Sequence, residues 1–209
     1  MLYAIGYHLC RWIARIFFAF SVEGQEHVPE SGPVILAPNH VSYLDPVVVG
    51  IAVTRRVHFM AKKELFRNPL LGWFLRGLQA YPVTRERVDP STLKRTLSLL
   101  ASGQTVLMFP EGTRGDGRAL RPAKPGIAVV AARSGAVVVP VFHWGTERVM
   151  PRGCRRVRRA PVRVRFGPPL IFPGRGRPER EAVETFCRDL MEAVAALRPA
   201  AEQPTTVSR

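Results

Sequence analysis

Cysteine is scarce in this 209-residue sequence, which contains only Cys10, Cys154 and Cys187. The three are far apart and odd in number, and none belongs to a Cys-x-x-Cys pair or a Cys/His cluster. This spacing excludes the usual zinc-ligand patterns and the disulfide framework of a small secreted domain. We therefore expect structural thiols in a reducing, cytoplasm-facing protein.

A long hydrophobic run is also missing. In the first twenty residues, MLYAIGYHLCRWIARIFFAF, the basic residues His8, Arg11 and Arg15 interrupt the apolar ones. A membrane-spanning helix needs about 20 mostly apolar residues, and a signal peptide needs a small-residue cleavage site that is absent here. On a helix the three basic residues share one stripe, which predicts an amphipathic, membrane-associating helix over residues 1–20. The alternative is a terminal helix packed on the domain's own core.

Acidic residues are few: 16 Asp and Glu face 31 Lys and Arg, which gives a net charge of +15. Such an excess favours an anionic partner, namely nucleic acid, an anionic bilayer or a phosphorylated ligand. The densest basic stretch, residues 152–165, would contact lipid headgroups or an acidic carrier protein, or would simply be solvated. No zinc-finger spacing, RNA-recognition block or helix-turn-helix pattern supports nucleic acid, so we expect none.

Strand-like and helix-like segments alternate along the chain, which predicts an α/β layer fold. We expect residues 21–197 to form one domain and residues 198–209 to form a flexible tail. Buried strands are expected at 33–39, 57–61, 80–83, 105–109, 136–142 and 162–166. Helices are expected at 42–53, 69–78, 91–100, 126–133 and 179–197.

The first candidate site, NHVSYLD (39–45), follows a predicted buried strand and opens a helix. Ligands usually bind at such strand ends in α/β sheets. His40 is the side chain best suited to take a proton near neutral pH, and an Asp on its other ring nitrogen would fix its tautomer. Spacing alone does not bring His40 and Asp45 together, although a strand-to-helix turn would. The alternative is a helix cap with a solvated histidine.

The second candidate site, FPEGTR (109–114), also follows a predicted buried strand. Gly112 permits close backbone approach, and the planar guanidinium of Arg114 suits a phosphate. Glu111 would hold either Arg114 or a neighbouring backbone amide. The alternative is an ordinary polar turn with a surface ion pair.

NHVSYLD and FPEGTR resemble, in order and in their separation of about seventy residues, two signature blocks of the glycerolipid acyltransferases. The resemblance is to the 1-acyl-sn-glycerol-3-phosphate acyltransferases in particular. Between the blocks, MAKKELFRNPLLGWFLRGLQAYPVTR is similar to the acceptor-binding region, with Lys62 and Arg85 at its basic positions. AVVVPV (136–141) resembles the apolar fourth block. Thr84 departs from the Asp or Asn of many relatives.

The resemblance implies a mixed sheet flanked by helices, as in glycerol-3-phosphate acyltransferase. It also implies that His40 is the general base and Asp45 orients it. The acyl group would pass from acyl-CoA or acyl carrier protein to the sn-2 hydroxyl of lysophosphatidic acid, with no metal or cofactor. Backbone amides of the His turn or the Glu-Gly-Thr turn would hold the oxyanion. The acceptor would be bound by Lys62, Arg85, Glu111, Gly112, Thr113 and Arg114.

The expected location is the cytoplasmic face of the cell membrane, as a peripheral or monotopic protein whose partners include membrane phospholipid. Because Thr84 bears on the acceptor headgroup, another lysolipid or amino-lipid hydroxyl remains an alternative acceptor. A non-catalytic basic protein that binds membranes or nucleic acid is the alternative outside the family.

Overall fold

The computed structural model describes residues 2–83, 90–151 and 156–200, and a seven-stranded sheet forms its centre. All neighbouring strands are parallel except β6 and β7, so the expected mixed sheet is confirmed. In spatial order the strands are β1 (Ser21–Glu23), β7 (Arg163–Phe166), β6 (Val137–Trp144), β2 (Val34–Pro38), β5 (Thr105–Leu107), β3 (Val57–Lys62) and β4 (Ala80–Val83).

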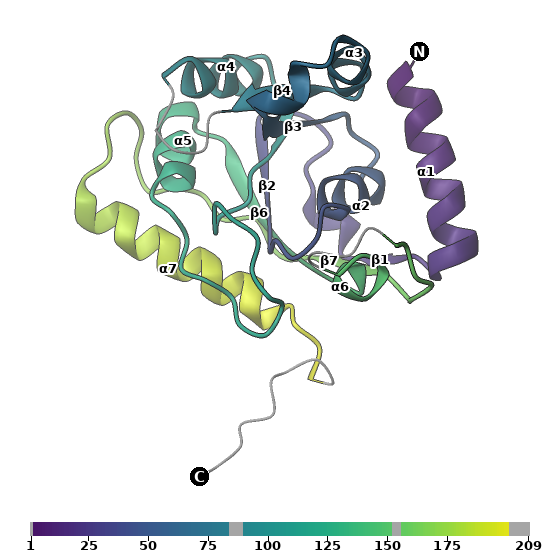
Figure 1. The fold of residues 1–209 in the computed structure, drawn as a ribbon. Coiled ribbons are helices and arrows are strands. Elements are labelled where there is room, and N and C mark those ends of the chain that lie inside the picture. The colour runs from purple at the N-terminus through teal and green to yellow at the C-terminus, as the bar shows by residue number, and fades with distance from the viewer. Residues whose placement is uncertain (1, 84–89, 152–155, 201–209) are drawn as a thin grey trace.

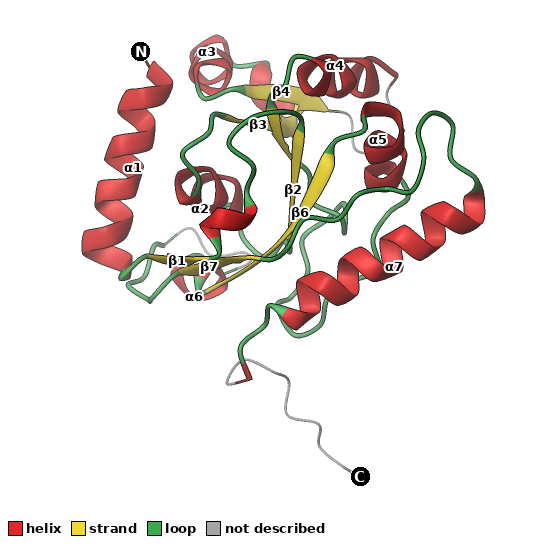
Figure 2. Ribbon diagram, turned by 180° about the vertical axis from the view of Figure 1, so that it is seen from behind, coloured by secondary structure: helices red, strands yellow, loops and turns green. Residues whose placement is uncertain are grey.

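Helices cover both faces of this sheet (Figure 1, Figure 2). On one face lie α1 (Leu2–Phe18) and α2 (Asp45–Ala52), and on the other lie α4 (Pro90–Ala101), α5 (Gly126–Ser134) and α7 (Arg180–Ala196). The short α3 (Pro69–Gly77) lies near the start of α1, and α6 (Thr146–Val149) follows β6. The chain is therefore the three-layer α/β structure that its alternating pattern predicts.

The central strand β2 is buried along its whole length, as expected of a parallel strand covered on both faces. Its side chains alternate between two apolar cores. Ile35 and Ala37 pack with residues of α4, α5 and α7, whereas Val34 and Leu36 pack with residues of α2. Both cores therefore fix β2, the strand that leads directly to the first candidate site.

The ends of two predicted strands need correction. The strand predicted at 105–109 ends at Leu107, so Met108 and Phe109 lead out of the sheet toward the candidate site. The strand predicted at 136–142 continues to Trp144 and so includes a buried histidine, His143. Its antiparallel pairing with β7, which an isolated sequence does not reveal, accounts for the extension.

Helix boundaries were predicted within a few residues. The helix predicted at 42–53 begins at Asp45, because residues 42–44 form a turn instead. At α3 the side chain of Asn68 accepts a hydrogen bond from the backbone N–H of Leu71, and Pro69 occupies the first turn. The three-residue β1 and the four-residue α6 are too short to show a periodic pattern in the sequence.

Within the segment predicted to associate with membrane, residues 1–20, the structure has the helix α1 (Leu2–Phe18), whose only buried residue is Ala14. Among the helices of the described ranges, none is both long enough and apolar enough to cross a bilayer. At the other end, the guanidinium of Arg198 donates hydrogen bonds to the carbonyl oxygens of Gly117 and Arg118. Most of the predicted tail, from residue 201 on, lies outside the described residues.

Gly145 connects β6 to α6 at a point where no side chain fits. Its φ is 95°, in the region that favours glycine, and a Cβ atom there would overlap the carbonyl oxygen of Pro161. The turn places Thr146 next to the first candidate site, so this glycine determines part of the site's geometry.

We expect Gly145→Ala to lower the free energy of unfolding by more than about 2 kcal/mol, since it combines backbone strain with a steric overlap. Gly50→Ala is the matched control: Gly50 lies within α2, nothing approaches the place of its Cβ, and alanine favours helix by about 1 kcal/mol. Urea denaturation of the three chains measures both effects. Equal stability of Gly145→Ala and the wild type would contradict the close approach to Pro161.

Candidate active site

His40 and Asp45 form a buried, hydrogen-bonded pair just beyond the end of β2. The imidazole Nδ1 of His40 lies 2.8 Å from Oδ2 of Asp45, and the two residues are 5% and 0% exposed. The same oxygen accepts the backbone N–H groups of Val41 and Ser42, at 2.7 and 2.8 Å. These bonds form the strand-to-helix turn that brings together two residues five positions apart.

The hydrogen bonds determine which nitrogen of His40 carries the proton. Burial alone would raise the pKa of Asp45, but the charge of His143 and the hydrogen bonds from His40 and Ser42 outweigh it, so the pKa is lowered. An ionised carboxylate only accepts hydrogen bonds, so Nδ1 of His40 is the donor. The neutral ring therefore presents Nε2 as its proton acceptor.

The structure adds His143, Thr146 and Asn39 to the site, and the motifs pointed to none of these roles. Thr146 donates its hydroxyl proton to Oδ1 of Asp45 at 2.8 Å, and Nε2 of His143 lies 3.7 Å from Oδ2. Nε2 of His143 also donates to the carbonyl oxygen of Asn39 at 2.8 Å. The Asn39 side chain bonds the backbone N–H and C=O of His143, which joins the ends of β2 and β6. His143 lies near the carboxyl end of the apolar strand β6, just as His40 follows β2, and this position at a strand end was the one sequence signal that could have indicated its role.

The second motif and the residue that follows it contact both the backbone and the ring of His40. Glu111 is buried, and its carboxylate accepts the backbone N–H of His40 at 3.0 Å and that of Arg121 at 3.2 Å. The N–H of Gly115 donates to the carbonyl oxygen of His40 at 2.7 Å. The Phe109 ring stacks on the imidazole with centroids 3.8 Å apart. Glu111 was expected to hold either Arg114 or a neighbouring backbone amide, and its observed partners are backbone amides. Burial raises the pKa of its carboxyl group.

Arg114 also reaches the first motif. Its guanidinium carbon lies 3.5 Å from the centroid of the Tyr43 ring, which is 66% exposed. Gly112 adopts a φ of 68°, a conformation that favours glycine, and only the flexible end of the Lys124 side chain lies near the place of its Cβ. Gly112 and Thr113 are exposed at the surface of the loop. The loop thus presents a cation and exposed backbone beside the buried His40.

Of the two basic residues predicted between the motifs, one can be placed. Lys62 is exposed at the end of β3, and β3 pairs in parallel with β5, so Lys62 lies at the same edge of the sheet as the Glu111 loop. Arg85 and the neighbouring Thr84 lie outside the described residues. The substrate-binding roles of all six predicted residues stay predictions.

The backbone amides of the His turn already have partners. The N–H groups of His40, Val41 and Ser42 donate to the carboxylates of Glu111 and Asp45. The N–H of Gly112 donates to the carbonyl oxygen of Phe109 at 3.1 Å. These four amides therefore do not form the oxyanion site suggested for the two turns.

No three His, Cys, Asp or Glu side chains within the described ranges are grouped to hold a metal ion. Cys10 and Cys187 are unbridged, and burial raises the pKa of both thiols, which fits their expected structural role. Cys154 lies outside the described residues.

A search of known families matches residues 19–144 to the model described as Acyltransferase. That range covers more than half of the chain and includes both motifs. The chain belongs to the acyltransferase family. The resemblance of NHVSYLD and FPEGTR to this family is thereby confirmed.

Two curated relatives are both named 1-acyl-sn-glycerol-3-phosphate acyltransferase. The chain is 32% identical to the Bacillus subtilis 1-acyl-sn-glycerol-3-phosphate acyltransferase over 150 residues, which are 71% of this chain and 72% of that protein. It is 35% identical over 142 residues to the chloroplastic 1-acyl-sn-glycerol-3-phosphate acyltransferase LPAT1 of Arabidopsis thaliana, covering 66% of this chain and 39% of that protein. The chain thus spans well under half of the Arabidopsis relative.

A solved structure shares the fold. It is the crystal structure of the 1-acyl-sn-glycerophosphate (LPA) acyltransferase PlsC from Thermotoga maritima. The TM-score is 0.74 at 24% sequence identity, and the match covers 100% of this chain and 80% of that one. The mixed sheet flanked by helices is therefore an arrangement that this solved acyltransferase also has.

We expect Asp45→Asn to lower the free energy of unfolding by about 2–3 kcal/mol, because the hydrogen bonds that the buried, charged carboxylate accepts are lost or weakened. The matched control is Asp189→Asn, which removes an exposed carboxylate near Arg188 and should change stability by under about 1 kcal/mol. Urea denaturation at neutral pH measures both variants. Equal losses in the two would contradict the structural role of Asp45.

The difference between wild type and Asp45→Asn should also depend on pH. The pKa of Asp45 is lowered on folding, so its ionised form contributes stability above the unfolded pKa, about 3.9. That contribution is lost as the pH falls through the folded pKa, so the two unfolding free energies should converge below about pH 4. A difference that stayed constant down to pH 3 would show that the charge of Asp45 is not what stabilises the fold.

Proposed function

We propose that this chain transfers a fatty acyl group from a thioester to the sn-2 hydroxyl of 1-acyl-glycerol-3-phosphate, giving phosphatidic acid. The observation that carries the proposal is the buried His40–Asp45 pair beside a loop that bears Arg114. The names of the Bacillus and Arabidopsis relatives support the choice of acceptor.

His40 acts as the general base. Its Nε2 takes the proton of the acceptor's hydroxyl as the oxygen attacks the thioester carbonyl, and Asp45 stabilises the resulting imidazolium. The tetrahedral intermediate collapses by breaking the C–S bond, and the departing thiolate takes the proton back from His40. The products are the acylated phosphate ester and a free thiol, so no acyl-enzyme and no external base is needed. Either acyl-CoA or acyl carrier protein can supply the thioester.

The acceptor's phosphate binds at the basic side of the site. Arg114 is the best-placed cation, because its guanidinium covers Tyr43, only three residues from His40 in the chain. Stacking on a ring face leaves the in-plane N–H groups of a guanidinium directed outward, which suits a phosphate. Lys62 at the end of β3 and Arg85 complete the proposed phosphate-binding set.

The substrate reaches this site from a membrane surface. Exposed apolar side chains follow one stripe of α1, where Ile5, Leu9, Trp12 and Ile16 are each more than 50% exposed. On α3, Leu70 and Trp73 are 79% and 65% exposed. Leu2 at the start of α1 packs against Gly77 at the end of α3, so the two helices are neighbours. A patch of this kind on two adjacent helices fits insertion into one leaflet.

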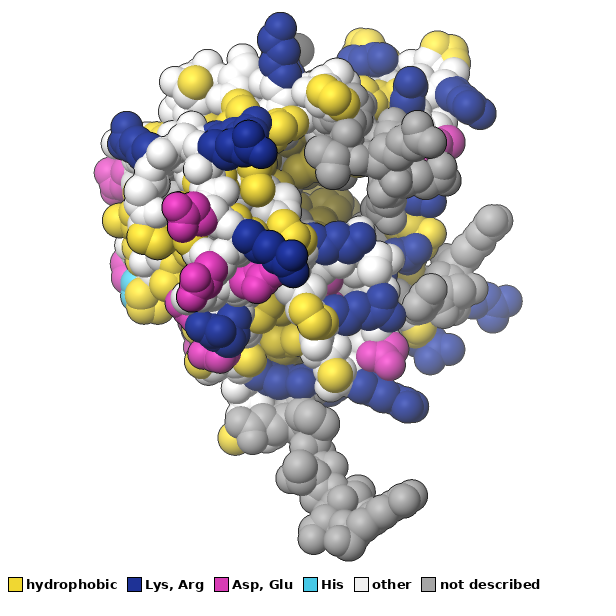
Figure 3. Space-filling model, turned by 90° about the vertical axis from the view of Figure 1, so that its left-hand side faces the viewer, with side chains coloured by type: hydrophobic (Ala, Val, Ile, Leu, Met, Phe, Trp, Pro, Cys, Tyr) yellow, Lys and Arg dark blue, Asp and Glu magenta, His cyan; other side chains and the backbone are white. Residues whose placement is uncertain are grey.

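Positive charge alone does not select this docking face. Many Lys and Arg side chains also lie on the face toward α4, α5 and α7, on the other side of the sheet from α1 (Figure 3). Within the basic stretch 152–165, Arg165 pairs with Glu23 and Arg159 lies over the Phe17 ring, so two of its arginines have partners in the fold. The exposed apolar residues of α1 and α3 are therefore what supports the proposed membrane-facing side, and location at the cytoplasmic leaflet stays a prediction.

His40→Ala is expected to reduce acyl transfer by about a hundredfold to ten-thousandfold, since general base catalysis contributes rates of that order. The test incubates the protein in detergent with lysophosphatidic acid and labelled acyl-CoA or acyl carrier protein, and measures phosphatidic acid. His8→Ala, which removes an exposed histidine of α1, is the control and should keep full activity. A folded His40→Ala protein that kept most of its activity would end this mechanism. If the wild type acylated other lysolipids but not lysophosphatidic acid, the assignment of the acceptor would be wrong and that of the reaction would stand.

Arg114→Ala should raise the KM for the lysophosphatidic acid acceptor roughly tenfold or more, because it removes charge-assisted hydrogen bonds to phosphate. The KM for the acyl donor should stay near the wild-type value. Arg118→Ala is the control, since Arg118 is an exposed arginine of the same loop. Steady-state kinetics with each substrate varied in turn separates the two effects, and a change in the donor's KM alone would contradict the phosphate assignment.

A further inference from the structure

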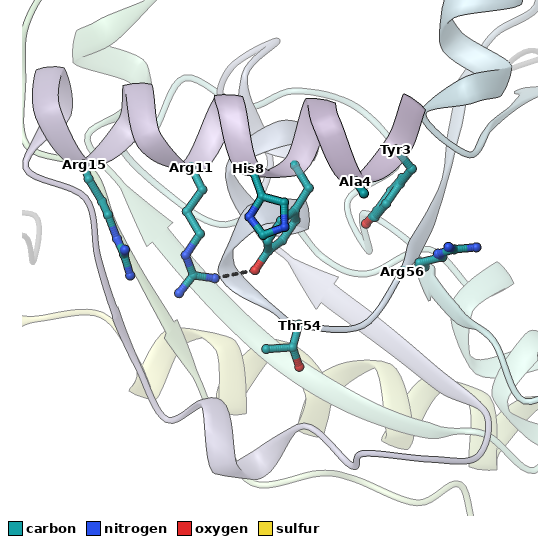
Figure 4. A pocket seen from close by; sticks show the side chains of 8 residues that line it. Tyr3, Ala4, His8, Arg11, Arg15, Thr54 and Arg56 are labelled. Atoms are coloured by element: carbon teal, nitrogen blue, oxygen red, sulfur yellow. Dashed lines mark hydrogen bonds between the residues drawn. The ribbon is translucent and has the colours of Figure 1, made fainter. Parts of the chain in front are cut away.

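A cleft of about 570 Å³ lies beside α1, and nothing in the proposed reaction uses it (Figure 4). One wall is α1, and the other is the segment that joins α2 to β3. Arg15, Arg11, His8 and Tyr3 project from the same side of α1, above Thr54 and Arg56 (Figure 4). The cleft is open enough for a polar group to enter from solvent, and its walls come from two separate elements.

The side chains that line the cleft carry positive charge without an acidic partner. Among the described residues, its walls contain three arginines and one histidine but no Asp or Glu. Arg15 and Arg56 are exposed. Arg11 is held in place by hydrogen bonds to the Tyr7 hydroxyl and, at 3.1 Å, to the carbonyl oxygen of Ile51. Several cations around one space, one of them already positioned, form a site suited to a phosphate.

The cleft is distinct from the site around His40. The two are connected through α2, which carries Asp45 at its start and contacts Arg11 near its end, at Ile51. Eight helical residues span about 12 Å at 1.5 Å per residue. A phosphate held by Arg15 and Arg56 therefore lies too far from His40 to belong to the reacting acceptor.

The cleft also borders the apolar stripe of α1. Trp12 follows His8 by four residues and precedes Arg15 by three, so these side chains are neighbours on the helix surface. If the stripe lies among acyl chains, its basic neighbours lie at the depth of lipid headgroups. We propose that the cleft binds the phosphate of an anionic membrane phospholipid that is neither substrate nor product. This proposal rests on the membrane docking proposed above and gives that docking a lipid preference.

The test is cosedimentation of the full chain with vesicles. Wild type, Arg15→Gln/Arg56→Gln and a control, Arg133→Gln/Arg177→Gln, are each mixed with phosphatidylcholine vesicles with or without phosphatidylglycerol. The control removes the same charge from exposed arginines of α5 and of the loop before α7. The cleft variant should bind vesicles containing phosphatidylglycerol at least about tenfold more weakly than the wild type, and the control should stay within about twofold.

Three results would overturn the site. Equal weakening in both double variants would show general attraction of charge, and no weakening in the cleft variant would show that the cleft binds no lipid. Acyl transfer to detergent-dispersed lysophosphatidic acid is measured in parallel and should be unchanged in both double variants. A wild-type protein that transfers acyl groups in detergent but does not bind vesicles containing phosphatidylglycerol would reject the lipid site and leave the proposed reaction standing. Failure of the transfer in the wild type would instead reject the reaction.

Discussion

A fully buried carboxylate needs compensation from its surroundings, and that of Asp45 has four hydrogen-bonding partners and a neighbouring histidine. An uncompensated charge in this position would cost several kcal/mol. Two of the partners are backbone N–H groups, which fixes the turn between β2 and α2. Another is Thr146, which fixes the start of α6. The charge that orients His40 is therefore also the charge that determines the local fold.

Glu111 fixes the backbone of the second motif, as Asp45 fixes that of the first. Its carboxylate bonds the backbone of His40 and of Arg121, so it fixes the course of the loop that carries Arg114. Because β5 lies directly beside β2, the two motifs meet although about seventy residues separate them. The candidate site thus consists of two buried acids that shape the backbone, with the imidazole of His40 between them and a loop bearing Arg114 beside it.

The sequence predicted the layers of the fold well, because buried parallel strands and turn residues have strong local signals, and it placed the candidate site at the ends of two of those strands. It predicted His40, Asp45 and the neighbouring loop from residues at strand ends and from resemblance. It did not predict His143, because this residue continues an apolar strand and its role depends on contact with Asn39, about a hundred residues away. Nor could spacing decide the partner of Glu111, since both alternatives were consistent with its position in the chain. These contacts join residues far apart in the chain, so only the structure could reveal them.

The order of pairing in the sheet affects how the protein assembles during synthesis. The neighbours of β2 are β5 and β6, so this apolar strand gains its first partner after residue 105 is made and its second after residue 137. Contacts this far apart in sequence form slowly, and a nascent chain exposes its unpaired strands until they form. Asp45 receives the hydroxyl of Thr146 only after a further 101 residues have been added to the chain. An emerging polypeptide therefore cannot complete the charge network around Asp45 until Thr146 has been synthesised.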